Sequence, residues 1–185
     1  MYDLNVSTDL RLREIEMSYA QQIFSIIDND REYLREWLPF VDYTRMVEDT
    51  EAFIKGIQAE PSDKKETTFV IIQENKVVGI IGFRGTDRAN HKTEIGYWLA
   101  QNKQGQGLIT RSCKTLLALS FTTLNMNRVM IKCAVNNAKS NAIPKRLGFT
   151  FEGVERSGEF LNGKYVDLDV YSLLRQEWKQ MNNAN

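Results

Sequence analysis

Residues 94–109 read EIGYWLAQNKQGQGLI, and the architecture of the chain can be worked out from them. Glu94–Leu99 has the apolar character of a strand, and a helical face begins at Ile109 and recurs every three to four residues. Gly105 and Gly107 let the backbone approach a ligand closely, and the free N–H groups of the helix's first turn then face that ligand. Because the positive end of the helix dipole lies behind them, these groups predict an anion site suited to a phosphate.

Two other glycine-rich nucleotide loops do not match this stretch. A dinucleotide-binding fingerprint has a third glycine where this chain has Thr110, and a Walker A loop continues into Gly-Lys-Ser or Gly-Lys-Thr, which does not follow here. A Gly-x-Gly turn before a helix is also compatible with a purely structural role. The neighbouring segments therefore have to indicate the ligand.

Around this stretch, hydrophobic periodicity predicts one α+β domain over residues 1–185. Asn162-Gly163 is a strong hairpin signal, and Gly148 is suited to end a helix. The predicted order is β-α-α-β-β-β-α-β-α-β-β, a mixed, mostly antiparallel sheet with flanking helices. The predicted strands are Leu10–Arg13, Thr67–Gln73, Lys76–Phe83, Glu94–Leu99, Arg128–Val135, Phe149–Leu161 and Lys164–Leu174, and the predicted helices cover residues 19–27, 47–59, 109–124 and 138–147.

The composition is that of an ordinary globular protein. The chain has 185 residues, 42% of them hydrophobic and 26% charged, which excludes a disordered or fibrous protein. Its net charge of zero argues against nucleic-acid or membrane-surface binding, and no apolar run approaches the roughly 20 residues that span a bilayer. Cys113, Cys133 and His91 make no metal-ligand set, so we expect no metal. No secretory signal pattern is visible and the cysteines resemble buried thiols, so we expect a cytoplasmic protein.

The net charge of zero conceals an uneven distribution of charged residues along the chain. Residues 1–64 contain 7 Lys and Arg against 14 Asp and Glu, and the rest of the chain is correspondingly basic. This pattern is compatible with an anionic ligand held by the second part and a cationic one attracted to the first. It is also compatible with a surface charge that serves solubility and nothing else.

Two motifs in the second half resemble those of one enzyme family. Ile95–Leu99 followed by Gln104–Gly107 is similar to the acetyl-CoA loop of the GNAT N-acetyltransferases. Asn137–Ser140 followed by Arg146–Phe149 is similar to the second motif of that family. The resemblance implies the GNAT fold and acetyl-CoA as cosubstrate, and it covers nearly the whole chain.

Two further segments point to one branch of that family. Arg35-Glu36-Trp37-Leu38-Pro39 and Leu161-Asn162-Gly163 resemble the RimJ/RimL branch, which acetylates the N-terminal amines of ribosomal proteins. The branch implies that the acceptor is a protein N-terminus.

The resemblance also assigns residues to acetyl-CoA. Backbone N–H groups of the glycine loop are expected to hold the pyrophosphate, the strand before it to pair with the pantetheine, and one asparagine to contact the cofactor. These residues are Gln104, Gly105, Gln106, Gly107, Leu108 and Ile109 for the loop, Tyr97, Trp98 and Leu99 for the strand, and Asn137. Nearby basic side chains suit a nucleotide phosphate, namely Lys103, Arg111, Lys114, Lys139, Lys145 and Arg146.

For catalysis, the resemblance implies Glu159 as the general base and Ser140 as the acid that protonates the leaving thiolate. Many family members use a tyrosine as this acid, but Pro144 occupies that position here. Glu94, on the strand beside the cofactor, is the competing base. Without the family, Glu159 would be interpreted as a solvated charge near a hairpin tip, and Ser140 as a residue that stabilises the first turn of its helix.

The implied reaction is direct attack of an amine on the thioester of acetyl-CoA in a ternary complex. A protein α-amine with a pKa near ~8 is about one-tenth free base at pH 7, whereas a lysine amine near ~10.4 is free in about one molecule in 2,500. A side-chain base such as Glu159 therefore suits an N-terminal α-amine better than a lysine, because the α-amine is already deprotonated far more often.

The acceptor is expected to meet Trp37 and Phe40, unless these aromatics pack in the core between helices. Two other functions stay open at this point. One is acetylation of a small-molecule amine, such as a polyamine, an aminoglycoside or an amino acid, and the other is a non-catalytic acyl-CoA-binding module. A homodimer contact through Leu173-Leu174 is also conceivable.

Overall fold

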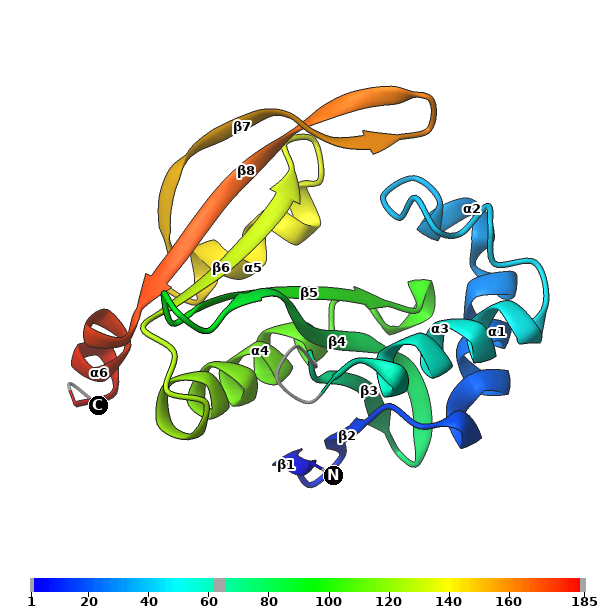
Figure 1. The fold of residues 1–185 in the computed structure, drawn as a ribbon, viewed down its shortest axis with the longest axis horizontal. Helices are drawn as coiled ribbons and strands as arrows, with labels where there is room; N and C mark the ends of the chain where they lie inside the picture. The colour runs from blue at the N-terminus through cyan, green and yellow to red at the C-terminus, as the bar shows by residue number, and fades with distance from the viewer. Residues whose placement is uncertain (1, 62–65, 184–185) are drawn as a thin grey trace.

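An eight-stranded sheet runs through the computed structural model, which describes residues 2–61 and 66–183 (Figure 1). Its strand order is β1-β2-β3-β4-β5-β6-β8-β7, and every neighbouring pair is antiparallel except β5 and β6. The mixed, mostly antiparallel sheet predicted from the sequence is thus confirmed, while residues 1, 62–65 and 184–185 of the predicted domain lie outside the described residues. The strands are β1 Asp3–Ser7, β2 Leu10–Glu14, β3 Thr68–Gln73, β4 Lys76–Asp87, β5 Lys92–Leu99, β6 Arg128–Ala134, β7 Thr150–Leu161 and β8 Lys164–Leu174.

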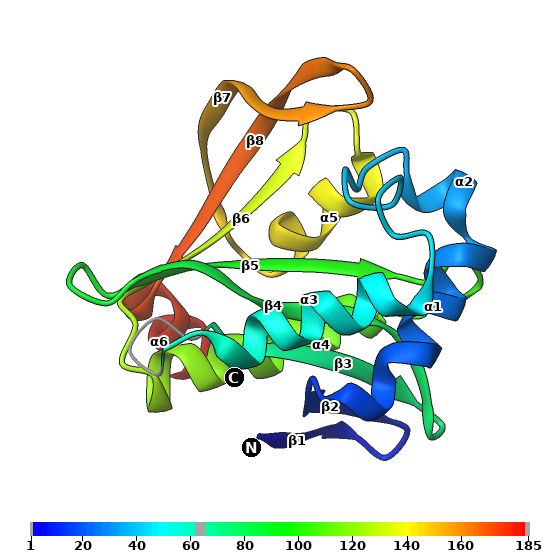
Figure 2. The same cartoon turned by 45° about the vertical axis from the view of Figure 1, so that its right-hand side comes forward.

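Helices cover both faces of this sheet (Figure 2). Side chains of one strand alternate between two cores, so that Phe69 and Ile71 pack with α4, whereas Val70 packs with α1 and α3. Because both faces are covered, the central strands are apolar runs without a polar side. The helices are α1 Ala20–Asn29, α2 Arg31–Leu34, α3 Val47–Ala59, α4 Leu108–Ala118, α5 Ala138–Arg146 and α6 Arg175–Asn183. None of those helices is both long and apolar enough to cross a membrane.

The turn and cap signals in the sequence correspond to matching backbone conformations. Asn162 and Gly163 have φ values of 50° and 79°, the left-handed pair that a tight two-residue hairpin requires. Helix α5 ends in a Schellman motif, in which the N–H of Phe149 bonds the Pro144 carbonyl at 3.0 Å and Gly148 has φ 77°. These local features set the ends of the elements around the site.

The sheet opens between β5 and β6. The two strands pair in register only from Lys92 with Arg128 to Glu94 with Met130. Beyond Glu94, residues 95–99 stay bonded to β4 while β6 diverges with β8 and β7, as Figures 1 and 2 show. The edge of β5 that faces this gap is therefore available to an extended ligand.

Three elements are present that the sequence analysis did not indicate, namely β1, α2 and α6. Helix α2 is a single turn, too short for a hydrophobic period to emerge. Helix α6 is mostly polar, and its place is set by Trp178, whose ring lies 5.5 Å from that of Phe121. The predicted helix over 109–124 also changes character, because α4 continues after Ala118 as a π-helical turn.

Of the two residues suggested for a dimer contact, Leu173 and Leu174, only Leu174 is accessible to a partner. Leu173 is fully buried in the chain's own core beside β6, so its side chain is not available to a partner. Leu174 is partly exposed.

Candidate active site

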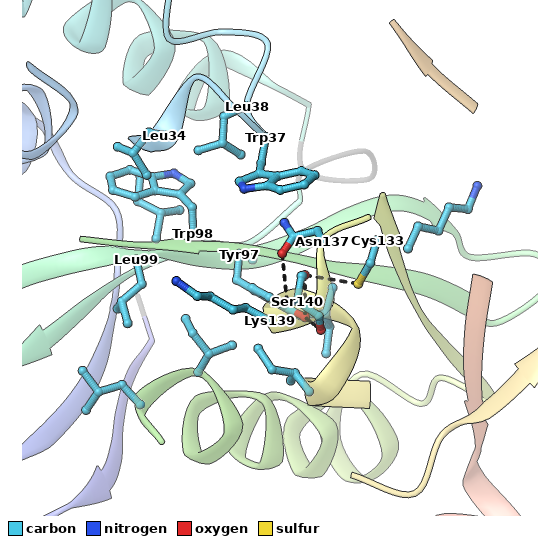
Figure 3. Close-up of a pocket in the computed structure, with 18 of the residues that line it drawn as sticks. Leu34, Trp37, Leu38, Tyr97, Trp98, Leu99, Cys133, Asn137, Lys139 and Ser140 are labelled. Atoms are coloured by element: carbon cyan, nitrogen blue, oxygen red, sulfur yellow. Dashed lines mark hydrogen bonds between the residues drawn. The ribbon is translucent and has the colours of Figure 1, made fainter. Parts of the chain in front are cut away.

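The opening between β5 and β6 holds a cavity of about 1370 Å³ (Figure 3). Its walls come from the β5–α4 segment, the end of β6 with the start of α5, the segment between α1 and α3, and β7. Of the residues expected in the glycine loop, the pantetheine strand, the acceptor wall and the favoured catalytic positions, together with Asn137, all but Gln106 line this cavity: Tyr97, Trp98, Leu99, Gln104, Gly105, Gly107, Leu108, Ile109, Asn137, Ser140, Glu159, Trp37 and Phe40.

The glycine loop leaves room for an anion at the start of α4. Gly105 and Gly107 have φ values of 74° and 70°, and a Cβ added to either would meet no atom within 4 Å. Gly107 is the N-cap of α4, and no side chain of the described residues caps that end. The first N–H bonded back into the helix is that of Arg111, which reaches the Gly107 carbonyl at 3.0 Å. Open space over free N–H groups fits the pyrophosphate of acetyl-CoA.

The side chains of Gln106 and of Arg111, which itself lines the cavity, tie this region to the rest of the chain. Gln106 turns its side chain away from the cavity, and its Oε1 accepts a hydrogen bond from Nε2 of the buried Gln73 at 3.1 Å. Arg111 donates to Oδ1 of Asp9 at 3.0 Å and to Ser7. The Arg111 guanidinium holds the pKa of the Asp9 carboxyl well below its usual range. Arg111, considered from sequence as a phosphate ligand, is thus already engaged by Asp9.

The other five basic side chains fall into two groups. Lys103, Lys139 and Arg146 line the cavity, and Lys139 donates to Oε1 of Gln104 at 2.8 Å. Lys114 and Lys145 do not line it. Three of the predicted phosphate contacts therefore stay candidates for the nucleotide part of the cosubstrate.

The start of α5 is held rigidly against β6. Asn137 is its N-cap, and Oδ1 of Asn137 accepts from the Ser140 N–H at 3.1 Å. The buried Asn141 donates to the carbonyls of Ala134 and Asn137 at 2.9 and 3.0 Å. Asn137, and not the Ser140 side chain, is therefore the cap of this helix.

Both cysteines are buried thiols, and burial raises the pKa of each. A protonated thiol is a poor nucleophile, so this environment favours direct transfer over an acetylated cysteine. Cys133 lines the cavity, with its Sγ 3.2 Å from the Ser140 hydroxyl. Residues 2–61 and 66–183 contain no cluster of three or more His, Cys, Asp or Glu side chains that could hold a metal ion.

The two candidate bases differ in their surroundings. Glu94 is only 8% exposed, does not line the cavity and is paired with Arg84, whose Nε lies 2.6 Å from its Oε1. Glu159, on β7, lines the cavity, and its carboxylate makes no hydrogen bond or ion pair with the described residues. Partial burial raises the pKa of Glu159, while the Arg84 cation opposes that rise.

The segment between α1 and α3 contributes aromatic side chains to the cavity lining. Trp37 and Phe40 belong to it, and Phe40 is 38% exposed, so these aromatics are not simply core residues. The β7–β8 turn meets this segment, because Nδ2 of Asn162 donates to the Arg35 carbonyl at 3.0 Å (Figure 2). The same segment, which the sequence analysis assigned to the acceptor, also supplies Leu34 and Leu38. Other lining residues belong to no motif and were not predicted from the sequence: Phe53, Ile57, Glu60, Glu66 and Arg84.

Residues 9–150 match the family described as "Acetyltransferase (GNAT) domain". The "Putative ribosomal N-acetyltransferase YdaF" of Bacillus subtilis (strain 168) is 33% identical over 180 residues, covering 97% of this chain and 98% of the relative. The "Ribosomal-protein-serine acetyltransferase" of Escherichia coli (strain K12) is 30% identical over 169 residues, covering 91% and 94%.

The fold has a similar counterpart among solved structures. RimL, a ribosomal L7/L12 alpha-N-protein acetyltransferase solved in complex with coenzyme A, superposes with a TM-score of 0.90 at 28% identity. The match covers 95% of this chain and 99% of that one.

Proposed function

Because the chain belongs to the GNAT acetyltransferase family, we propose that it transfers the acetyl group of acetyl-CoA to the N-terminal α-amine of a protein. The observation that carries the proposal is the layout of one cavity. A loop suited to a pyrophosphate lines it, and so does a carboxylate without a hydrogen-bond partner among the described residues, that of Glu159. The names of the relatives support a ribosomal protein as the acceptor. Acetylation of a ribosomal protein would take place in the cytoplasm.

In this proposal the chain holds acetyl-CoA at three places. The N–H groups at the start of α4 take the pyrophosphate, and the cavity-facing edge of Tyr97–Leu99 pairs with the pantetheine as an added strand. Asn137 and the lysines Lys103 and Lys139 line the same cavity. Bound acetyl-CoA supplies a thioester and a thiol leaving group.

Glu159 is the proposed base. It accepts the proton that the amine loses as the new C–N bond forms, and its raised pKa brings it closer to neutrality, where a base is most effective. Glu94 is less suited to this task, because its carboxylate is paired with Arg84 and does not line the cavity. A backbone N–H of the β5 edge is available to the carbonyl oxygen of the acetyl group.

Ser140 is the proposed acid. As the C–S bond breaks, its hydroxyl gives a proton to the sulfur and regains one from water, so the products are the acetylated amine and the free thiol. The Asn137 cap holds this part of α5 at the cavity wall.

A second acceptor class has one observation in its favour. Glu60 and Glu66 line the same cavity as Glu159, and several carboxylates in one cavity attract a polycation such as a polyamine. The panel of acceptors in the test therefore has to include one.

The test measures CoA release with acetyl-CoA and matched acceptors. These are a peptide with a free N-terminus, the same peptide blocked at its N-terminus but carrying a lysine, spermidine, an aminoglycoside and a free amino acid. Turnover with the free-N-terminus peptide and not with its blocked form supports the proposal. Turnover with spermidine or another small amine in its place makes this a small-molecule acetyltransferase, and CoA binding without turnover makes it a binding module.

The natural acceptor can then be sought among ribosomal proteins. Mass spectrometry of their N-termini, from cells with and without this enzyme, is expected to show a protein that gains 42 mass units, one acetyl group, in the presence of the enzyme. Identical N-termini in both samples would count against a ribosomal acceptor.

A further inference from the structure

The side chain of Tyr97 reaches from β5 to the first turn of α5 (Figure 3). Its hydroxyl donates to the Ser140 carbonyl oxygen at 3.3 Å and accepts from the Ser140 Oγ at 3.3 Å. The phenol thus contacts both the main chain and the side chain of Ser140. The resemblance to the GNAT family assigns only the backbone of Tyr97, so this side chain has no role in the site described so far.

Pro144 explains why the Ser140 carbonyl takes a donor from outside its helix. In an α-helix the N–H of residue 144 would donate to the carbonyl of residue 140, but proline has no N–H. The Tyr97 hydroxyl stands in for the missing donor. Many family members carry a tyrosine at this position of the helix. This chain has Pro144 there, and the phenol of Tyr97 reaches the helix from β5.

We propose that Tyr97 is a positioning residue for the acid step, holding the Ser140 carbonyl and hydroxyl in the orientation from which the hydroxyl serves the leaving sulfur. The inference rests on the proposed function, in which Ser140 is the acid. Tyr97 acts through Ser140 and does not give up its own proton.

The environment of the phenol suits a constant hydrogen-bonding role. Burial raises the pKa of Tyr97 well above its ordinary value, so the group stays protonated at neutral and moderately alkaline pH. Cys133, the other neighbour of the Ser140 hydroxyl, offers a thiol, which is a weak donor and a weak acceptor. Of the two neighbours, Tyr97 is therefore the one able to orient Ser140.

The first test compares Tyr97→Phe, Ser140→Ala and the double variant with a free-N-terminus peptide as acceptor. Phenylalanine keeps the ring and removes the hydroxyl. We expect Tyr97→Phe to lower kcat about tenfold, the effect of one hydrogen bond, with KM for acetyl-CoA within about twofold of wild type. The double variant is expected to match Ser140→Ala, because a positioning residue has no effect once its target is removed. Tyr43→Phe, at a residue 78% exposed, is the matched control and should keep full activity.

The second test restores the missing helical donor. Pro144→Ala supplies an N–H for the Ser140 carbonyl, so adding it to Tyr97→Phe is expected to recover part of the lost kcat. Amide hydrogen exchange over α5 gives a readout that needs no acetyl-CoA. We expect faster exchange at the start of α5 in Tyr97→Phe and slower exchange again in Tyr97→Phe/Pro144→Ala.

The results distinguish this inference from the function on which it rests. Full kcat in Tyr97→Phe, or losses in kcat that multiply in the double variant, would overturn the positioning role while peptide acetylation by the wild type stands. Unchanged exchange in Tyr97→Phe would overturn it as well. A wild type that acetylates none of the amines would remove the proposed function, and the exchange experiment would still report whether Tyr97 holds α5.

Discussion

Arg84 donates to Glu94 across the β4–β5 ladder, with 2.6 Å between Nε and Oε1, and this pair separates the two carboxylates that compete for the role of base. Glu94 is neutralised by a cation and lies outside the cavity lining. Glu159 stands at the cavity wall with no such partner among the described residues. The pair therefore favours Glu159.

Glu159→Gln keeps the shape of the side chain and removes the proton acceptor. We expect kcat for a peptide acceptor to fall by ~10²–10⁴ near neutral pH, while acetyl-CoA affinity measured by calorimetry stays within about twofold. The loss should shrink as pH rises, because more of the acceptor amine is already deprotonated. Glu94→Gln is the control. A pH-dependent loss in Glu94→Gln together with full activity of Glu159→Gln at pH 7 would transfer the role to Glu94.

The pH profile should respond to Arg84. A base must be deprotonated to act, so kcat/KM falls as pH drops through the pKa of Glu159, which burial raises above its ordinary value. Arg84 opposes that rise. In Arg84→Met the pKa of Glu159 is expected to rise further, so the acidic limb of the kcat/KM profile should move to higher pH. A limb that stays in place or moves to lower pH would mean that it reports another group.

Gly107→Val tests the pyrophosphate loop. Gly107 has φ 70°, a conformation that costs a β-branched residue ~1–3 kcal/mol, and the new side chain would occupy the open space above the helix N-terminus. We expect no measurable acetyl-CoA binding in calorimetry and a cooperative thermal transition. Gly56→Val, at an exposed position of α3 with nothing near it, is the matched control and should bind normally. Unchanged affinity in Gly107→Val would remove the loop from the site.

Gln73→Met tests the hydrogen bond that Gln73 makes with Gln106 of that loop. Methionine fills the buried space, but it cannot donate to Oε1 of Gln106. We expect KM for acetyl-CoA to rise several-fold, on the order of one lost hydrogen bond, with kcat nearly unchanged. Gln21→Met, on the exposed side of α1, is the control. A loss confined to kcat would place the effect of Gln73 elsewhere than in cosubstrate binding.

Trp37→Ala tests the acceptor wall. The indole belongs to the segment between α1 and α3 and lines the cavity. We expect a KM for the peptide acceptor raised at least tenfold and an acetyl-CoA affinity within about twofold of wild type. If acetyl-CoA affinity falls and the KM for the acceptor does not, Trp37 belongs to the cosubstrate site.

Much of this fold and cofactor loop was predictable because its signals are local. The strand over Glu94–Leu99, the two glycines and the helix after them are contiguous, and each depends on the conformational range of a few neighbouring residues. The same holds for the Asn162-Gly163 turn and for Gly148 at the end of α5. Such patterns predict the mixed α+β sheet, and the resemblance of the two motifs to the GNAT family implies the GNAT fold.

The catalytic surroundings depend on long-range packing and could not be read from a pattern. Tyr97 and Ser140 are 43 residues apart, Gln73 and Gln106 are 33 apart, and Arg111 lies 102 residues from Asp9. Spacing along the chain carries no information about such partners, because hydrogen bonds and ion pairs depend on distances of a few ångströms in space. The pairing of Glu94 with Arg84, which favours Glu159 as the proposed base, likewise depends on where the β4–β5 ladder places the guanidinium of Arg84.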